Sequence, residues 1–264
     1  MTALTRAFAV AAAAIVAAVI AVLIWPNSPA SSPAAAEQRV TLPASPRPAL
    51  QVPRPVLLPH SAGTSYWASV RRDALARAAP SPRARVVSPL TTTTPEGTTN
   101  IVLVLGRSTN SAGRLWVHVR LPVLPNGRTG WVPREALGVY GVVHTRLVVD
   151  LERLTATLLR GKRSVLRAPV GVGEPQWPTP TGEFYIRNVL TSFSSPFYGP
   201  VAFGTSARSS VLTDWPGGGF IGIHGTDLPQ LLPGRVSHGC IRLRNEDILR
   251  LRKLMPVGTP VTIR

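Results

Sequence analysis

The only cysteine of the 264-residue chain lies in the run Ser237-His238-Gly239-Cys240-Ile241-Arg242. A further histidine, His224, comes fourteen residues before His238. An imidazole within reach can take the proton of a thiol, and a glycine lets backbone amides approach a developing oxyanion. A lone thiol with these neighbours is typical of a cysteine nucleophile that transfers an acyl group through a covalent intermediate.

The same side chains permit other interpretations. Cys240 could be an inert buried cysteine, a common state of free thiols in proteins. His224, His238 and Cys240 could instead hold zinc, if a fourth ligand or a water completed the site. The nucleophile remains the main hypothesis, and we expect neither a metal nor a cofactor.

An arginine, Arg242, follows the cysteine by two residues. Its guanidinium can favour the thiolate or bind the carboxylate of a substrate. Alternatively, Arg242 can pair on the surface with Glu246 or Asp247.

The composition limits which compartment and which classes of partner we expect. The net charge is +17 and nearly all of the cations are arginines, which suits an anionic lipid or an anionic polymer such as a cell wall. The arginines are scattered and no nucleic-acid motif is present, so we expect no nucleic-acid partner. A single cysteine excludes a disulfide within the chain.

The N-terminal segment predicts export. Residues 7–25 are apolar and uncharged, which is long for a signal-peptide core and close to the length that spans a bilayer. We expect a hydrophobic helix within residues 1–27, acting as a signal anchor or a cleaved signal peptide, with the uncleaved anchor favoured. Residues 28–64 are rich in Pro and Ala and predict an extended linker. The folded part would then work in the cell envelope, attached to the membrane or released from it.

Short runs rich in β-branched and aromatic residues follow, at residues 84–90, 100–105 and 114–121. Clusters of Gly, Pro and Asn separate them, so residues 65–141 predict a small all-β barrel. The run Leu-Trp-Val-His-Val at 115–119, with Gly-Trp-Val-Pro at 130–133, resembles bacterial SH3-like modules. Such modules bind cell-wall peptide or glycan or act as spacers, and Trp116 and Trp131 either stack on a ligand or pack in the core.

Residues 142–264 predict a second, mainly β domain with one or two short helices. Alternating runs lie at 145–150, 154–159 and 164–170, and Gly161-Lys162 predicts a hairpin turn between the last two. Further strands are expected at 182–190, 220–223 and 260–263. Residues 245–254 carry apolar residues at helical spacing.

Three motifs in this domain resemble those of the L,D-transpeptidases of bacterial cell walls, the YkuD type. They are Thr179-Pro180-Thr181-Gly182, Ile223-His224-Gly225-Thr226 and the run from Ser237 to Arg242. The resemblance covers residues 143–264. It implies a cysteine-dependent acyltransferase that acts on peptidoglycan stem peptides, in cell-wall biogenesis and the maintenance of cell shape, and that reacts with carbapenem-type inhibitors.

The resemblance also implies a role for each residue. Cys240 attacks a tetrapeptide stem between an L-centre and a D-centre, the terminal D-alanine leaves, and the side-chain amine of a diamino acid on a second stem forms the crosslink. His224 is the base, oriented by the Gly225 carbonyl, and His238 supports the site. The amides of Gly239 and Cys240 are expected oxyanion donors. Ser237 and Arg242 are the expected substrate-binding side chains.

Related functions share the same nucleophile and stay open. An L,D-carboxypeptidase would give the acyl group to water, and another enzyme would give it to a protein amine or a D-amino acid. A non-catalytic wall-binding protein is the remaining alternative. The sequence leaves open the acceptor, the diamino acid, the ligand of the β module, the oligomeric state and the cleavage of the N-terminal segment.

Overall fold

The computed structural model describes residues 56–57, 63–191, 195–213 and 218–264. Within these ranges the chain is mainly β, with eighteen strands and one α-helix. No helix in the described ranges has the length and apolar character needed to cross a membrane. The expected N-terminal helix and nearly all of the expected linker lie outside the described residues and stay predictions.

Eight strands form the first sheet, in the order β4-β3-β7-β6-β5-β2-β8, with β1 paired to β5. Antiparallel pairs join these strands. A short 3-10 turn, η1 (Arg134–Ala136), precedes the last strand. The strands are β1 (Val56–Leu57), β2 (Ser65–Val70), β3 (Ala74–Arg77), β4 (Val86–Leu90), β5 (Ile101–Thr109), β6 (Leu115–Arg120), β7 (Thr129–Pro133) and β8 (Leu137–Val143).

The tryptophans of the first sheet differ in their packing. Trp116 on β6 is 1% exposed, and Val117 and Val119 on the other face of the strand are fully buried. Trp131 on β7 is partly exposed and stacks on His118, with the ring centroids 4.7 Å apart. Trp116 therefore packs in the core, while Trp131 keeps an accessible edge. The SH3-like identity of this region stays a prediction.

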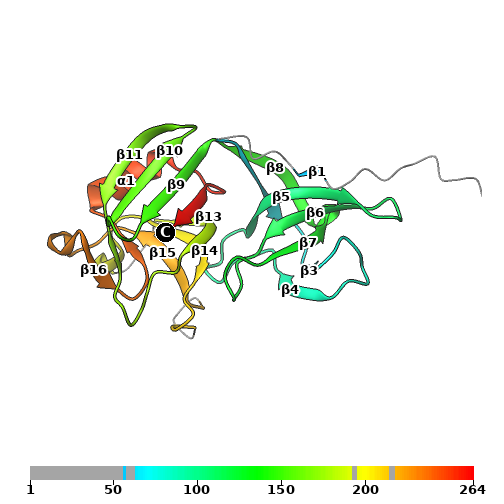
Figure 1. The fold of residues 1–264 in the computed structure, drawn as a ribbon, viewed down its shortest axis with the longest axis horizontal. Helices are drawn as coiled ribbons and strands as arrows, with labels where there is room; N and C mark the ends of the chain where they lie inside the picture. Colours follow the sequence, from blue (N-terminus) through cyan, green and yellow to red (C-terminus); the bar gives the residue numbers. More distant parts are fainter. Residues whose placement is uncertain (1–55, 58–62, 192–194, 214–217) are drawn as a thin grey trace, which may run out of the picture. The chain divides into compact units, whose positions relative to one another are not determined.

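Ten strands form the second sheet, in the order β11-β10-β9-β18-β13-β14-β15-β17-β12-β16 (Figure 1). The hairpin expected at Gly161-Lys162 is confirmed, since β10 and β11 pair antiparallel on either side of it. The strands are β9 (Thr145–Asp150), β10 (Thr155–Arg160), β11 (Arg163–Pro169), β12 (Gly171–Gly173), β13 (Gly182–Leu190), β14 (Ala202–Arg208), β15 (Phe220–His224), β16 (Gly234–Ser237), β17 (Ile241–Arg242) and β18 (Pro260–Ile263).

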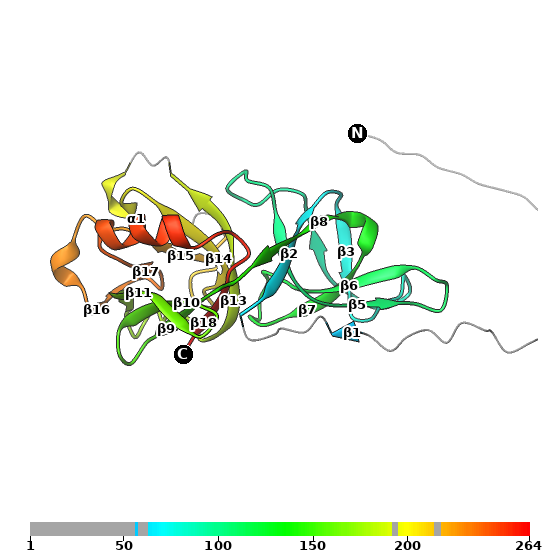
Figure 2. The same ribbon diagram turned by 90° about the horizontal axis from the view of Figure 1, so that it is seen from above.

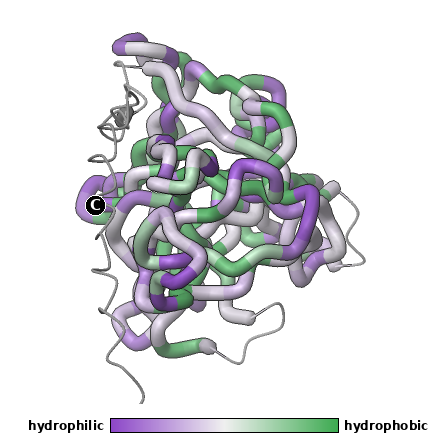
Figure 3. Tube along the Cα trace, turned by 90° about the vertical axis from the view of Figure 1, so that its right-hand side faces the viewer, coloured by the Kyte–Doolittle hydropathy of each residue, from purple (hydrophilic) through white to green (hydrophobic). Residues whose placement is uncertain are grey.

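The expected helix is confirmed as α1 (Asn245–Leu254). Ile248 and Leu251 on α1 are fully buried and belong to the same core cluster as Ile223 of β15 and Ile241 of β17. Figure 2 shows α1 beside the strands around β15 and β17, and the hydropathy colouring of Figure 3 places hydrophobic segments in the interior. The helix therefore covers the strand pair that carries the two sequence motifs around His224 and Cys240.

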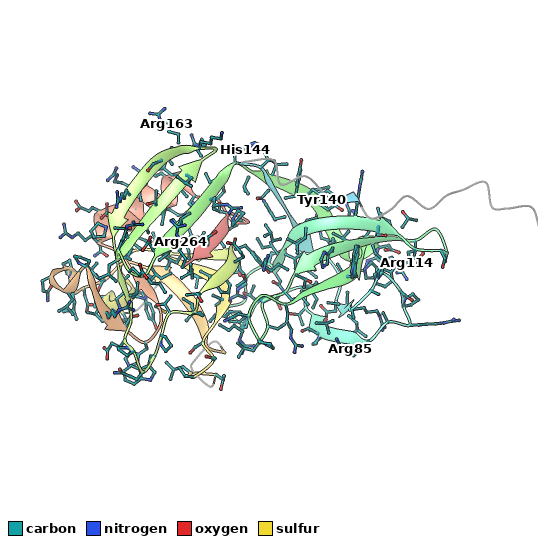
Figure 4. The ribbon with its side chains drawn as sticks, viewed as in Figure 1. Arg85, Arg114, Tyr140, His144, Arg163 and Arg264 are labelled. Carbon is teal, nitrogen blue, oxygen red and sulfur yellow. The ribbon has the colours of Figure 1, made fainter. Side chains whose placement is uncertain are left out.

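The described residues of both sheets belong to one compact unit. Tyr185 of β13 is fully buried, and its hydroxyl donates a hydrogen bond to the Ile101 carbonyl of β5 at 3.0 Å. Exposed arginines lie on both sheets: Figure 4 labels Arg85 and Arg114 near the first sheet and Arg163 and Arg264 on the second. The positive charge is therefore distributed over the unit.

Candidate active site

The parallel pair β15–β17 brings the cysteine and the first histidine together. Its register places His224 opposite Arg242. Because successive side chains of a strand alternate between faces, Gly222 and Cys240, each two residues earlier, lie on that same face. The isoleucine between each pair faces the opposite side and is fully buried in the core. The alternation therefore places the candidate reactive side chains on one face of the strand pair and the buried core side chains on the other.

The Cys240 thiol is held against the strand that carries the histidine. The Gly222 amide donates a hydrogen bond to Cys240 Sγ at 3.3 Å. A Cβ on Gly222 would lie 3.7 Å from Cys240 Sγ and 3.7 Å from His224 Cδ2, so those two atoms are at most twice that distance apart. Burial raises the pKa of Cys240, although the Gly222 amide and the Arg242 charge oppose it. Cys240 is therefore mainly a protonated thiol at neutral pH.

His224 is arranged as a neutral base. It is 1% exposed, and its Nδ1 lies 2.6 Å from the Gly225 carbonyl oxygen. A carbonyl only accepts, so Nδ1 carries the proton and Nε2 carries a lone pair. Within the described ranges Nε2 is buried without a hydrogen-bond partner. Burial lowers the pKa of His224 to about 4, opposed by the Gly225 carbonyl and assisted by the Arg242 charge.

The Gly225 carbonyl is fixed by its surroundings. The Gly225 amide donates to the Val201 carbonyl at 3.3 Å, and Asn245 Oδ1 accepts from the Thr226 amide at 3.0 Å. A Cβ on Gly225 would lie only 2.3 Å from Asn245 Oδ1 and 3.0 Å from Gly199 Cα. Glycine is therefore required here for close backbone approach, and its carbonyl is the hydrogen-bond partner of His224 Nδ1.

The loop before Cys240 is closed by hydroxyl groups. Ser237 Oγ donates to the Cys240 carbonyl at 2.6 Å and accepts from the Gly239 amide at 3.1 Å. Thr179 Oγ1 donates to the Gly239 carbonyl at 2.8 Å. Gly239 has φ +110, a conformation that favours glycine.

These contacts revise two expectations. The Gly239 amide is engaged by Ser237 and is not free for an oxyanion, which leaves the Cys240 amide as the expected donor. Ser237 is fully buried and its hydroxyl binds the loop backbone, so its contacts indicate a positioning role and give no support to substrate binding. The physical reason is that a tight turn before the cysteine must satisfy its own backbone groups.

Arg242 faces the pocket. It is 6% exposed, and its guanidinium carbon lies 4.5 Å from the centroid of the Phe197 ring. Its Nε is buried and has no hydrogen-bond partner among the described residues. Asp247 pairs with Arg250 at 3.5 Å. The surface pairing of Arg242 is therefore not what the structure shows, and its charge acts on Cys240 and His224.

His238 lies at the rim of the same pocket, which also contains Cys240, His224 and Arg242. Its side chain is exposed, and its ring centroid is 4.0 Å from that of Trp177. Across the described ranges, no group of three His, Cys, Asp or Glu side chains is placed to hold a metal ion. The ring of His238 is exposed to solvent, whereas the ring of His224 is buried.

Comparison with known proteins agrees with this geometry. Residues 144–263 match the YkuD family model, the L,D-transpeptidase catalytic domain. The resemblance inferred from the three motifs is confirmed for this stretch. The chain spans 64% of the putative L,D-transpeptidase YkuD of Bacillus subtilis, and the aligned 117 residues are 36% identical and make up 44% of this chain.

More distant relatives carry the same description. The probable L,D-transpeptidase YbiS of Escherichia coli K12 is 28% identical over 158 residues, which cover 52% of this chain and 50% of that protein. A crystal structure of an Enterococcus faecium L,D-transpeptidase is 26% identical, with 46% of this chain and 49% of that chain covered and a TM-score of 0.36. The chain thus spans half to just under two thirds of these curated relatives.

The structure adds an aromatic wall to the pocket of Cys240 that sequence reasoning missed. Phe197 and Tyr198 belong to the 3-10 turn η2 (Pro196–Tyr198), and Tyr198 lies 5.1 Å from His224 between ring centroids. Leu212, Phe220 and Ile221 continue the wall. The aromatic pair before Gly199 and Pro200 was the available signal, but residues 191–219 carry no periodicity that assigns them to the site.

Proposed function

We propose that this chain is a peptidoglycan L,D-transpeptidase that forms crosslinks through a thioester on Cys240. One observation carries the proposal: a buried, neutral imidazole, whose Nε2 has no hydrogen-bond partner among the described residues, lies beside the only thiol of the chain. The match of the surrounding residues to the L,D-transpeptidase catalytic domain supports the choice of substrate.

In the first half-reaction, His224 Nε2 takes the thiol proton as Cys240 Sγ attacks the stem-peptide carbonyl. Because both groups are neutral at rest, the proton moves together with the attack, as in general-base catalysis. The oxyanion forms beside the Cys240 amide. His224 then protonates the departing amine, the C–N bond breaks, and D-alanine leaves a thioester behind.

In the second half-reaction, the side-chain amine of a diamino acid attacks the thioester. His224 takes the amine proton and returns it to Sγ as the C–S bond breaks. One amide replaces another, so the balance needs no oxidant or reductant. The Arg242 guanidinium, beside Phe197 in the pocket, is placed to attract a stem-peptide carboxylate.

The location of the enzyme belongs to the same proposal. Residues 1–27 would anchor the chain or direct its export, and residues 28–64 would space the folded unit from the membrane. Work in the cell envelope brings the enzyme to its peptidoglycan substrate. Residues 65–141 would form the SH3-like module, and the surface arginines suit an anionic wall polymer.

Product analysis tests the proposal. We expect purified protein with a tetrapeptide donor and an amine-bearing stem peptide to yield a crosslinked product and free D-alanine. The Cys240→Ala variant should keep its fold, by circular dichroism, and yield neither. Release of D-alanine without crosslinking, with the acceptor present, would identify an L,D-carboxypeptidase instead. Full activity of Cys240→Ala would exclude the thioester.

A carbapenem offers a second probe of the same thiol. The family resemblance implies that a carbapenem such as imipenem acylates Cys240. We expect one imipenem-derived acyl group on wild-type protein and none on Cys240→Ala. A folded wild type that is never acylated would favour the non-catalytic wall-binding alternative.

A further inference from the structure

Phe220, which begins β15 and lines the pocket of Cys240, is contacted by two arginines. The guanidinium carbon of Arg187 lies 3.7 Å from the ring centroid, and that of Arg208 lies 5.0 Å from it. His224 lies at the other end of the same short strand. The position of the Phe220 ring therefore depends on how these two arginines are held.

Arg187 is held by the second sheet through Thr205 and by the first sheet through Glu96. It is 2% exposed, its Nε donates to the Thr205 carbonyl at 2.8 Å, and its Nη2 donates to Glu96 Oε1 at 2.9 Å. Glu96 lies in the turn between β4 and β5. Its other oxygen accepts from Asn188 Nδ2 at 3.1 Å. A buried guanidinium that loses its carboxylate is left without a charge partner, so we expect Glu96 to help determine where Arg187 lies.

Arg208 is held by a different turn of the first sheet. Asn126, between β6 and β7, donates from Nδ2 to the Arg208 carbonyl at 2.8 Å and accepts from the Arg208 amide at 3.0 Å. The Arg208 side chain donates to the Gly218 carbonyl through Nε at 2.9 Å. Asn126 thus binds the backbone of Arg208 in the manner of a paired strand.

We infer that Glu96 and Asn126 are positioning residues for the active site, which act through Arg187 and Arg208 on Phe220. The β module then supports the pocket wall through these two arginines and is not only a spacer or a wall-binding domain. The expected effect of Glu96 and Asn126 on stem-peptide turnover rests on the proposed function. Their expected effect on the shape of the pocket does not depend on the proposed function.

Labelling of the single cysteine tests the inference without any substrate. We expect Glu96→Gln and Asn126→Ala to raise the ratio of N-phenylmaleimide to iodoacetamide rate constants about threefold, since a displaced wall admits the bulky reagent. Two controls alter turns or ion pairs of the same sheet. Glu135→Gln removes the partner of Arg114, and Asn110→Ala removes the acceptor of two turn amides. The ratio should stay at the wild-type value in both controls.

A double-mutant cycle separates positioning from general loosening. If Glu96 acts through Phe220, Glu96→Gln should leave the ratio unchanged once Phe220→Leu is present. The same threefold increase in both backgrounds would overturn the inference, as would an unchanged ratio in both single variants. Thermal unfolding identifies variants whose fold is lost, and Glu96→Asp, which keeps the charge, should restore part of the wild-type ratio.

Turnover provides the link to the proposed function. With a tetrapeptide donor we expect Glu96→Gln to raise KM about fivefold and to leave kcat within about twofold, the signature of lost binding. A wild type without acyl transfer would refute the proposed function alone, because the labelling ratio would still be measurable. An unchanged KM together with an unchanged ratio would refute the positioning role alone.

Discussion

At the residue scale, the candidate site is a pair of neutral groups, a thiol and an imidazole. Burial moves the pKa of Cys240 upward and that of His224 downward, and both shifts disfavour a resting thiolate–imidazolium pair. The nearby Arg242 charge favours the thiolate and disfavours the imidazolium. The chemistry therefore depends on proton transfer during attack, which makes the contacts of Arg242 and Gly225 part of the mechanism.

The low pKa of His224 predicts a pH dependence of stability. Its pKa is about 4 in the folded chain against an ordinary 6.5, so between these values the unfolded chain binds a proton that the folded chain does not. The contribution to the free energy of unfolding is fully present above about pH 6.5 and declines toward pH 4, by on the order of 3 kcal/mol. Urea unfolding should show wild type losing more stability than His224→Gln between pH 7 and pH 4.5. Equal losses would contradict the buried neutral imidazole.

The charge of Arg242 predicts the titration of the thiol. Because this charge lowers the pKa of Cys240, Arg242→Gln should move the rise of the iodoacetamide rate to higher pH. Arg244→Gln removes the same charge from an exposed position two residues later and should leave the profile in place. Coincident profiles for wild type and Arg242→Gln would show that the guanidinium does not act on the thiol.

At the element scale, the parallel pair β15–β17 positions the reactive side chains of the site. Two short strands place His224 and Cys240 side by side on one face, and α1 packs behind them. The carbonyl that orients His224 comes from the residue immediately after β15. A change confined to this turn should therefore affect the base without moving the thiol.

The variant Gly225→Ala tests whether the base can be disturbed without moving the thiol. Its Cβ would meet Asn245 Oδ1 at 2.3 Å, so we expect the carbonyl to shift and the acylation rate at neutral pH to fall at least tenfold, on the order of the loss of a general base. At high pH, where the thiol ionises unaided, iodoacetamide labelling should stay near the wild-type rate. Gly113→Ala, in an open turn with φ +75, is the control and should affect neither rate. Unchanged acylation in Gly225→Ala would contradict the orienting role.

The sequence predicted the elements whose pattern is local. The helix at 245–254, the hairpin at Gly161-Lys162 and the strand that ends at His224 carry clear periodicity or turn residues, and each is confirmed. β14 was missed because Ala-Phe-Gly-Thr-Ser-Ala-Arg has no alternation of apolar and polar residues. β12 was missed because Gly-Val-Gly offers too little pattern.

The candidate site also contains features that the sequence predicted and features that it did not. The residue types around Cys240 were readable from spacing and from the family resemblance. The use of the Gly239 amide by Ser237 was not, because it depends on how the turn satisfies its own hydrogen bonds. The aromatic wall and the Arg187–Glu96 pair join residues far apart in the chain, and no local pattern reports such contacts.

At the scale of the whole molecule, the described residues of the two sheets belong to one compact unit and share buried and partly buried polar contacts. Tyr185 donates to Ile101, and Glu96 and Asn126 bind arginines of the second sheet. Buried hydrogen bonds of this kind are costly to break on one side only. The two sheets should therefore unfold in a single transition.

A pair of tyrosine variants tests this coupling. Tyr185→Phe removes the donor to a buried carbonyl and should lower the free energy of unfolding by about 1–3 kcal/mol. Tyr140→Phe is the matched control: within the described part of the chain its buried hydroxyl has no hydrogen-bond partner, so its removal should cost nothing. Urea unfolding followed by fluorescence and by circular dichroism should give coincident curves for wild type. Separate transitions, or equal effects of the two variants, would contradict the coupling.

We expect Cys240 to carry the acyl group, and intact-mass spectrometry can detect that group on the protein. Wild type and Cys240→Ala would each be incubated with a tetrapeptide stem and quenched in acid, which preserves a thioester. We expect wild type to gain the mass of the tetrapeptide minus D-alanine, with the adduct mapped to Cys240, and the variant to gain nothing. A folded wild type without the adduct, or the same adduct on Cys240→Ala, would contradict it.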